Sequence, residues 1–367
     1  MIGVPDGVSE QTLAAAAGLL GGLVLGLAAR RARFCTLGAI EDAIYADDLA
    51  RARMWALAAA VAIAATFGLD ALGATALDQT FYALNAWNPV ASVVGGLTFG
   101  YGMALAGNCG FTALARAGGG DLKSVVILLV MAVASYVVVS GPLASARVAV
   151  FELGPADPGG SLGYAHAIAD LLSLPPLAPA VLVAVAIGAW ALRSRSFRAD
   201  RLSIGWAVAV GAAIAFGWWA TGWLARTGFE ALPVESYTFT GPLGETLLYA
   251  MTSSGGGLSF SVGSVFGVVL GGFLGSWSQS EFRWEACEDP RELGRQMFGA
   301  ILMGFGGVVA VGCSVGQGLT AASTLTFSAP IVVCAVILGA ALGLRQLIEG
   351  VSPTRSLAMW LGFRHAD

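Results

Sequence analysis

Charged side chains are scarce in this chain, and their scarcity excludes most soluble folds. Only 11% of the 367 residues are Asp, Glu, Lys or Arg, whereas charged residues make up about a quarter of an ordinary soluble domain. Hydrophobic residues account for 57%, and the 51 glycines fit membrane helices whose small residues let two backbones approach closely. The composition therefore predicts an all-α polytopic membrane protein that forms one integral domain in the lipid bilayer.

Histidine is nearly absent, and the motifs of the common enzyme chemistries are missing. The chain has two histidines, and its five cysteines form no CxxC pair, so a zinc or haem site has almost no ligands to draw on. No Walker A loop, nucleotide-binding motif or Ser-His-Asp order occurs. We therefore expect no metal site, no cofactor and no catalytic residues, which favours a transporter over an enzyme.

Long apolar runs, by contrast, recur along the whole chain. Runs of about 17 to 25 apolar residues can cross the hydrocarbon core. Basic residues such as Arg30 and Arg31 occur in every second connection, while the other connections carry mainly acids, among them Asp78, Glu235 and Glu245. The positive-inside rule then predicts an N-terminus outside and a C-terminus in the cytoplasm. We predict nine spans, centred near Leu20, Val61, Leu97, Met131, Val185, Gly211, Leu270, Phe305 and Ile337.

Two cysteines close similar glycine-rich stretches. Residues 107–110 read Gly-Asn-Cys-Gly and residues 311–314 read Val-Gly-Cys-Ser, and an alignment without a gap places Gly100 on Gly304 and Gly102 on Gly306. The third and eighth spans, which precede Cys109 and Cys313, are separated by an odd number of crossings and therefore run in opposite directions. The two thiols would approach each other from opposite faces, as in inverted repeats with a binding site near the midplane.

The stretch after Cys313 supports this arrangement. Residues 313–330 contain no charge but many glycines, serines and threonines, and irregular backbone at membrane depth is tolerated only where it is buried in protein or lines a cavity. We therefore predict re-entrant cysteine-bearing loops. The predicted organisation is a first repeat at about 12–143, a linking span at about 178–192 and a second repeat at about 203–345.

Not every cysteine belongs to this pattern. A membrane thiol next to glycine often serves only as a small packing residue, and we keep that interpretation for Cys334, in an apolar run, and for Cys287, in an acidic loop. Cys35 is intermediate, because it follows Arg33 and Phe34 at the basic end of the first span.

With these features the chain resembles the YeeE/YedE family of membrane proteins, which handle thiosulfate and related sulfur compounds. The resemblance rests on the duplicated glycine-rich helices that end at a cysteine and on the earlier Arg-Phe-Cys motif, and it covers nearly the whole chain. It implies an hourglass fold in a bacterial inner membrane, with thiosulfate passing Cys35, Cys109 and Cys313. No sulfur-carrier domain is appended, so a cytoplasmic carrier would be a separate protein.

We predict a pathway in which weak donors replace the hydration shell of a sulfur anion without trapping it. Removing a doubly charged anion from water is costly, neutral thiols and helix N-termini can compensate, and a thiolate would repel the anion. The alternatives are a sulfurtransferase that carries a persulfide on Cys35 or Cys109, a transporter of a selenium compound, and a channel for uncharged solutes. The predicted pathway residues are Cys35, Cys109, Cys313, Gly110, Gly312, Ser314, Asn108 and Gln317.

Overall fold

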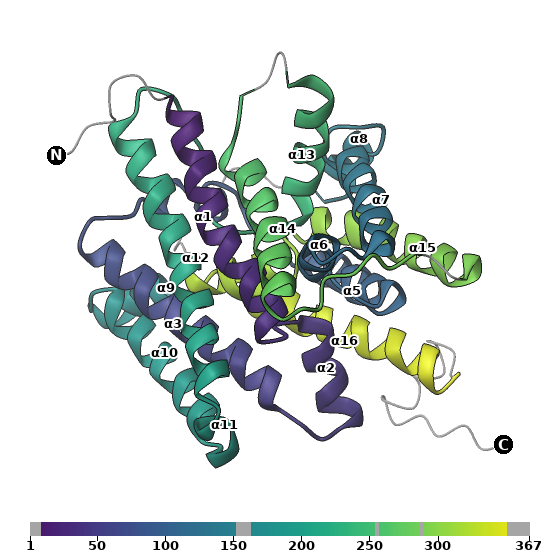
Figure 1. Cartoon of the computed structure of the whole chain (residues 1–367). Coiled ribbons are helices and arrows are strands. Elements are labelled where there is room, and N and C mark those ends of the chain that lie inside the picture. Colours follow the sequence, from purple (N-terminus) through teal and green to yellow (C-terminus); the bar gives the residue numbers. More distant parts are fainter. Residues whose placement is uncertain (1–8, 152–162, 254–256, 287–288, 351–367) are drawn as a thin grey trace.

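A computed structural model describes residues 9–151, 163–253, 257–286 and 289–350, and these residues form an almost entirely helical bundle (Figure 1). Within the described ranges the β structure consists of two isolated bridges, Thr80 with Val234 and Asp121 with Glu285. The prediction of an all-α polytopic membrane protein is confirmed. Among the described residues, seven helical segments are long and apolar enough to cross a membrane: Glu10–Tyr45, Ala50–Ala71, Pro89–Gly118, Leu122–Val139, Arg201–Thr227, Phe260–Ser278 and Ser328–Ile348.

Each of the nine predicted span centres lies in a different helix, although the number of crossings stays a prediction. The helix around Val185 is only 16 residues long, and the helix around Phe305 carries charges in its first two turns. The helices up to residue 151 are α1 (Glu10–Arg31), α2 (Thr36–Tyr45), α3 (Ala50–Ala71), η1 (Leu77–Gln79), α4 (Phe81–Leu84), α5 (Pro89–Ala106), α6 (Gly110–Gly118), α7 (Leu122–Val139) and α8 (Ala144–Val150). The later helices are α9 (Tyr164–Leu172), α10 (Leu177–Leu192), α11 (Arg195–Ala199), α12 (Arg201–Thr227), α13 (Thr240–Thr252), α14 (Phe260–Ser278), α15 (Pro290–Val309), η2 (Gly316–Ala321) and α16 (Ser328–Ile348).

The two helices that lead to Cys109 and Cys313 begin in the same way. Helix α5 starts with Asn88 at the N-cap and Pro89 in the first turn, and α15 starts with Asp289 and Pro290 in the same positions. The Asn88 and Asp289 side chains accept backbone N–H groups of the first turn, and proline suits the first helical position because no partner exists there for an N–H. Local sequence therefore fixes where both helices enter the bundle.

The packing pairs of the two halves correspond. Helix α1 packs on α14 and α12 packs on α3, while α5 packs on α16 and α15 packs on α7. The contact of α6 with α14 likewise corresponds to the contact of η2 with α3. The contact of α13 with α7 corresponds to that of α2 with α16. Every one of these pairs maps onto its counterpart if α1–α2–α3–α5–α6–α7 is matched, in order, with α12–α13–α14–α15–η2–α16.

Glycines at matched positions make matched contacts. A side chain at Gly100 would collide with Val336 of α16, and one at Gly304 would collide with Met131 of α7. A side chain at Gly102 would meet Gly299 of α15. Likewise one at Gly306 would meet Gly95 and Phe99 of α5. Close contact between two helices requires a glycine at each of these positions. The gap-free alignment of the sequence therefore pairs residues that play corresponding packing roles.

The bundle has two chemically different ends. At the arginine-rich face α1 ends at Arg30 and Arg31 and α12 begins at Arg201. At the opposite, acidic face lie the ends of α3 and α12, near Asp70 and Glu230. In Figure 1 α12 ends near the top, where α13 and α8 also lie, and α6 lies in the middle of the bundle.

Candidate functional site

Three of the predicted cysteines stand directly before short helices in the interior. Cys35 is the N-cap of α2 and its sulfur accepts the Gly38 N–H at 3.4 Å. Cys109 is the N-cap of α6 and is fully buried. Cys313 precedes the helical turn that leads into η2, and its sulfur accepts the Gly316 N–H at 3.4 Å. Helix N-termini carry a partial positive charge, so all three sulfurs lie where an anion is stabilised.

A sharp turn brings the chain to each cysteine. Two residues before each of them the backbone is left-handed, at Arg33 (φ 51°), Gly107 (φ 75°) and Val311 (φ 57°). This conformation is costly for residues other than glycine, above all for a β-branched residue such as valine. The strain at Arg33 and Val311 is stored beside the thiols and is held by the surrounding packing.

One hydroxyl group contacts two of the thiols. Thr112 lies one turn into α6, with its Oγ1 atom 3.4 Å from the sulfur of Cys109 and 4.0 Å from the sulfur of Cys35. The same hydroxyl oxygen accepts the Cys109 N–H at 3.1 Å. Thr112 therefore joins the first two cysteines into a single polar cluster.

The third cysteine has one side-chain partner from another segment, and a glutamine holds the turn that carries it. The Thr238 hydroxyl lies 3.8 Å from the sulfur of Cys313. The side-chain amide of Gln317 donates to the carbonyl oxygens of Ala310 and Val311 at 2.8 and 2.9 Å. Gln317 therefore clamps the turn that presents Cys313, and its amide hydrogens are directed at the backbone.

A row of aromatic rings connects the surroundings of the three cysteines. Trp55 stacks on Phe34 with centroids 4.4 Å apart, Phe34 meets Phe111 edge-on at 6.5 Å, and Phe111 stacks on Phe239 at 5.4 Å. Phe34 precedes Cys35, Phe111 follows Cys109 by two residues, and Phe239 follows the Thr238 that contacts Cys313. Ring edges carry partial positive charge, so this row supplies weak polarity without a formal charge.

The remaining predicted pathway residues occupy the turns around the thiols. Asn108 and Ser314 are buried, and their Oδ1 and Oγ atoms have no hydrogen-bond partner within the described part of the chain. Gly110 packs against the Met131 side chain, and Gly312 has φ 149°, which only glycine adopts readily. Buried polar atoms without partners are uncommon in proteins, so the Asn108 Oδ1 and Ser314 Oγ atoms keep unused hydrogen-bonding capacity beside the thiols.

One further cysteine of the described residues stands apart from this cluster. Cys334 lies on α16 and is exposed on the outside of the bundle. Cys287 lies outside the residues that the structure describes. The described residues contain no group of His, Cys, Asp and Glu that could hold a metal ion.

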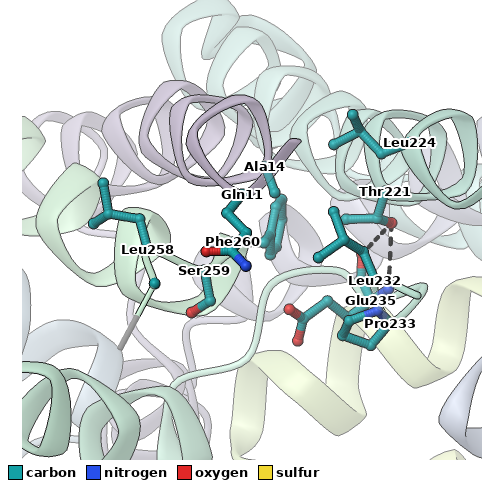
Figure 2. Close-up of a pocket in the computed structure, with 11 residues that line it drawn as sticks. Gln11, Ala14, Thr221, Leu224, Leu232, Pro233, Glu235, Leu258, Ser259 and Phe260 are labelled. Carbon is teal, nitrogen blue, oxygen red and sulfur yellow. Dashed lines mark hydrogen bonds between the residues drawn. The ribbon is translucent and has the colours of Figure 1, made fainter. Parts of the chain in front are cut away.

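A cavity of about 580 Å³ extends from the acidic face to the Cys313 turn. Its wall includes Val311 and Gly312, and also Thr238, the residue that contacts the Cys313 sulfur. A smaller cavity of about 200 Å³ adjoins it and shares Pro233 and Glu235 with it. Figure 2 shows this smaller cavity, with the Glu235 carboxylate pointing away from Thr221 toward the side of Ser259 and Phe260.

Sequence reasoning missed several residues of the site. Thr112 could have been found as the third residue after a cysteine N-cap, a position whose side chain commonly reaches back to the cap. Thr238 and Phe239 carry no such mark, because their turn before α13 has no cysteine. Glu235, which the sequence suggests is a loop charge, lines both interior cavities.

Comparison with known proteins gives consistent matches over most of the chain. The family model for sulphur transport, Sulf_transp, matches residues 31–342. The chain is 26% identical over 340 residues to the thiosulfate transporter TsuA of Escherichia coli strain K12, covering 88% of this chain and 91% of that protein. It is 25% identical over 329 residues to the thiosulfate transporter TsuA of Spirochaeta thermophila, covering 88% and 96%.

Proposed function

Since the chain belongs to the sulphur-transport family, we propose that it imports thiosulfate or a closely related inorganic sulfur compound through a central pathway. The pathway is lined by the thiols of Cys35, Cys109 and Cys313. The observation that carries the proposal is the placement of all three sulfurs at helix N-termini in the interior, joined by Thr112 and by the row of aromatic rings. Both relatives described above are named as thiosulfate transporters.

The chemistry of the cluster suits an anion that must pass without being trapped. A dianion loses its hydration when it enters the protein and needs replacement donors. Neutral thiols, the N–H groups of three short helices, and the Ser314 hydroxyl supply donors of moderate strength. A lysine or arginine at the same place would bind the dianion much more tightly and would slow its release.

We also propose that the two matched sets of helices are inverted repeats in a bacterial inner membrane, with the acidic face outside. The corresponding packing pairs and the corresponding glycines support this arrangement. An impermeant maleimide added from outside should label a reporter cysteine in place of Asp78 and should not label one in place of Arg198, in a background without native cysteines. Labelling of both from one side would overturn the topology.

The runner-up function is a sulfurtransferase. A thiol would take the sulfane sulfur of thiosulfate to form a persulfide, and sulfite would leave. This reaction needs a nucleophilic thiolate, whereas the hydrogen-bond partners of the Cys35 and Cys109 sulfurs among the described residues are the Thr112 hydroxyl and, for Cys35, the Gly38 N–H, with no lysine or arginine. Transport of a selenium compound and handover to a separate cytoplasmic sulfur carrier are further proposals that share the same pathway.

The test is uptake of labelled thiosulfate into proteoliposomes, with sulfate and selenite as competitors. The proposal predicts saturable uptake that excess unlabelled thiosulfate suppresses and sulfate leaves largely unchanged, because sulfate lacks the soft sulfane sulfur. Absence of uptake above that of empty liposomes would refute the transport function. Stronger competition by selenite than by thiosulfate would shift the assignment to the selenium compound.

A further inference from the structure

The larger cavity on the acidic face has a mixed charge that bears on how an anion reaches Cys313. Its wall is built from η1, α4, α7, α8, α12, α13, α14, α15 and η2, from the loop 233–238 and from the turn at Val311 and Gly312. Among its lining residues, three carry a formal charge: Arg147 of α8, Glu235 of the loop and Glu245 of α13. Tyr82 adds a phenol, and the Cys313 thiol lies behind the wall, in contact with the lining residue Thr238. Among the described residues, the titratable and charged side chains that line the cavity are therefore Arg147, Glu235, Glu245 and Tyr82, with the Cys313 thiol behind its wall.

Arg147 is fixed in a geometry that leaves donors available. Its Nε atom donates to the Val138 carbonyl oxygen at 3.1 Å. Among the described residues no carboxylate lies within 4 Å of its guanidinium, since the ion pairs of this part of the chain involve other arginines. A guanidinium with free N–H groups can hold an oxyanion in two-point contact.

The two glutamates oppose anion binding when they are ionised. With both carboxylates charged, the three lining charges sum to minus one, and a dianion would meet net repulsion. Protonation of one carboxyl makes the sum zero, and protonation of both leaves the positive charge of Arg147. The cavity therefore accepts a dianion well only when the pair carries a proton.

Glu235 is the member of the pair that the fold holds in place. Thr221 Oγ1 accepts its backbone N–H at 3.2 Å and donates to its carbonyl at 2.8 Å, while the Ser261 hydroxyl donates to its carboxylate at 3.1 Å. Burial and the neighbouring Glu245 carboxylate raise the pKa of Glu235 to about 8, against the opposing effect of the Ser261 hydrogen bond. A raised carboxyl pKa means that the proton is held below about pH 8 and lost above it.

We infer that the outer cavity is a proton-linked anion site, in which Arg147 contacts the dianion and Glu235 takes up a proton when the dianion binds. The inference rests on the proposed function, because it assigns this cavity as the outer part of the thiosulfate pathway. By linkage, protonation strengthens anion binding by the same factor by which the anion strengthens protonation. Uptake should then decline as pH rises through the pKa of Glu235.

The pH profile of uptake tests the inference in proteoliposomes at thiosulfate concentrations well below half-saturation. For a single required proton with a pKa of about 8, the initial rate should fall about tenfold between pH 7 and pH 9. Glu235→Gln should remove most of that decline, and Glu245→Gln should move its midpoint to lower pH, because a neighbouring negative charge is lost. The matched control is Glu230→Gln, an exposed carboxylate of the same loop, which should keep the wild-type profile.

A binding measurement gives a second readout that does not depend on transport. Calorimetry with thiosulfate at pH 8, in two buffers of different ionisation enthalpy, should show proton uptake by the wild type and none by Glu235→Gln. Arg147→Gln should raise the half-saturating concentration more than Arg147→Lys does. Binding without proton uptake, or an unchanged pH profile in Glu235→Gln, would overturn the linkage.

The outcomes separate the two levels of the proposal. No uptake by the wild type at any pH would overturn both the transport function and the linkage. Uptake that stays constant from pH 6 to pH 9 would overturn the linkage alone and leave the thiol pathway intact. If Glu235→Gln fails to fold, the midpoint shift in Glu245→Gln and the wild-type proton count decide the question.

Discussion

The two halves of the molecule reach the centre by corresponding turns but place different side chains there. In the first half the turn between α1 and α2 presents Cys35 at the N-cap of α2. In the second half the turn between α12 and α13 presents Phe239 at the N-cap of α13, with no side-chain cap. The architecture therefore does not require a thiol at this position. A thiol there is what the proposed pathway role of Cys35 predicts.

A second difference lies at the third residue after each of the three cysteines. The third residue after Cys313 is Gly316 and the third after Cys35 is Gly38, and each donates its N–H to the cysteine sulfur. The third residue after Cys109 is Thr112, whose hydroxyl lies near the sulfurs of Cys109 and Cys35. The first half thus holds a coupled pair of thiols, and the second half holds a single thiol flanked by Thr238.

The largest expected effect comes from removing the one thiol that each half contributes at its matched position. Cys109→Ala and Cys313→Ala should each reduce thiosulfate uptake to the level of empty liposomes, because the anion must pass both. Alanine leaves the turns intact, so detergent-solubilised yield and thermal stability should stay close to the wild type. Near-normal uptake in both variants would assign these cysteines to packing.

Thr112→Val tests the coupling that distinguishes the first half. Loss of one buried hydrogen bond costs about 1 kcal/mol, so uptake should fall roughly fivefold, and Thr112→Ser should restore most of it. The counterpart in the second half, Thr238→Val, should have the smaller effect because its hydroxyl reaches one thiol. Equal effects of the two valine variants would remove the distinction.

The turns before the matched cysteines provide a stability comparison. Gly107→Val should lower the unfolding free energy by about 2 kcal/mol, because a β-branched residue would enter the left-handed region. Val311→Gly should be neutral or stabilising, since it relieves that strain at the entropic cost of glycine. Thermal unfolding in detergent measures both. A loss of stability in Val311→Gly equal to that in Gly107→Val would show that the valine side chain, rather than its backbone conformation, matters.

The smallest expected effect is at Cys334. Its side chain is exposed on α16, away from the central cluster, so Cys334→Ala should leave the uptake rate within about 1.5-fold of the wild type, as for surface substitutions in general. A marked loss of transport with normal folding would show that Cys334 takes part in transport, which contradicts its exposed position away from the central cluster.

The sequence alone predicts some residues of the candidate site and not others. The glycine alignment pairs Cys109 with Cys313. It is visible in the sequence because close helix contact requires glycine itself at the matched positions. Phe239 and Thr238 were not predicted as site residues, because a turn without a cysteine or a left-handed glycine has no distinct sequence pattern. Glu235 escaped because its burial depends on how α12, α13 and α14 pack, which hydropathy along one segment does not contain.

The central claim is that the anion passes the three thiols intact, and thiosulfate labelled separately on its two sulfur atoms tests it most directly. Uptake of an intact anion predicts that the sulfane and sulfonate labels enter proteoliposomes in equal amounts, while the intact mass of the protein stays unchanged. A sulfurtransferase would deliver the sulfane label alone and leave sulfite outside, with a reductant-sensitive gain of about one sulfur atom on Cys35 or Cys109. That second result would contradict the account.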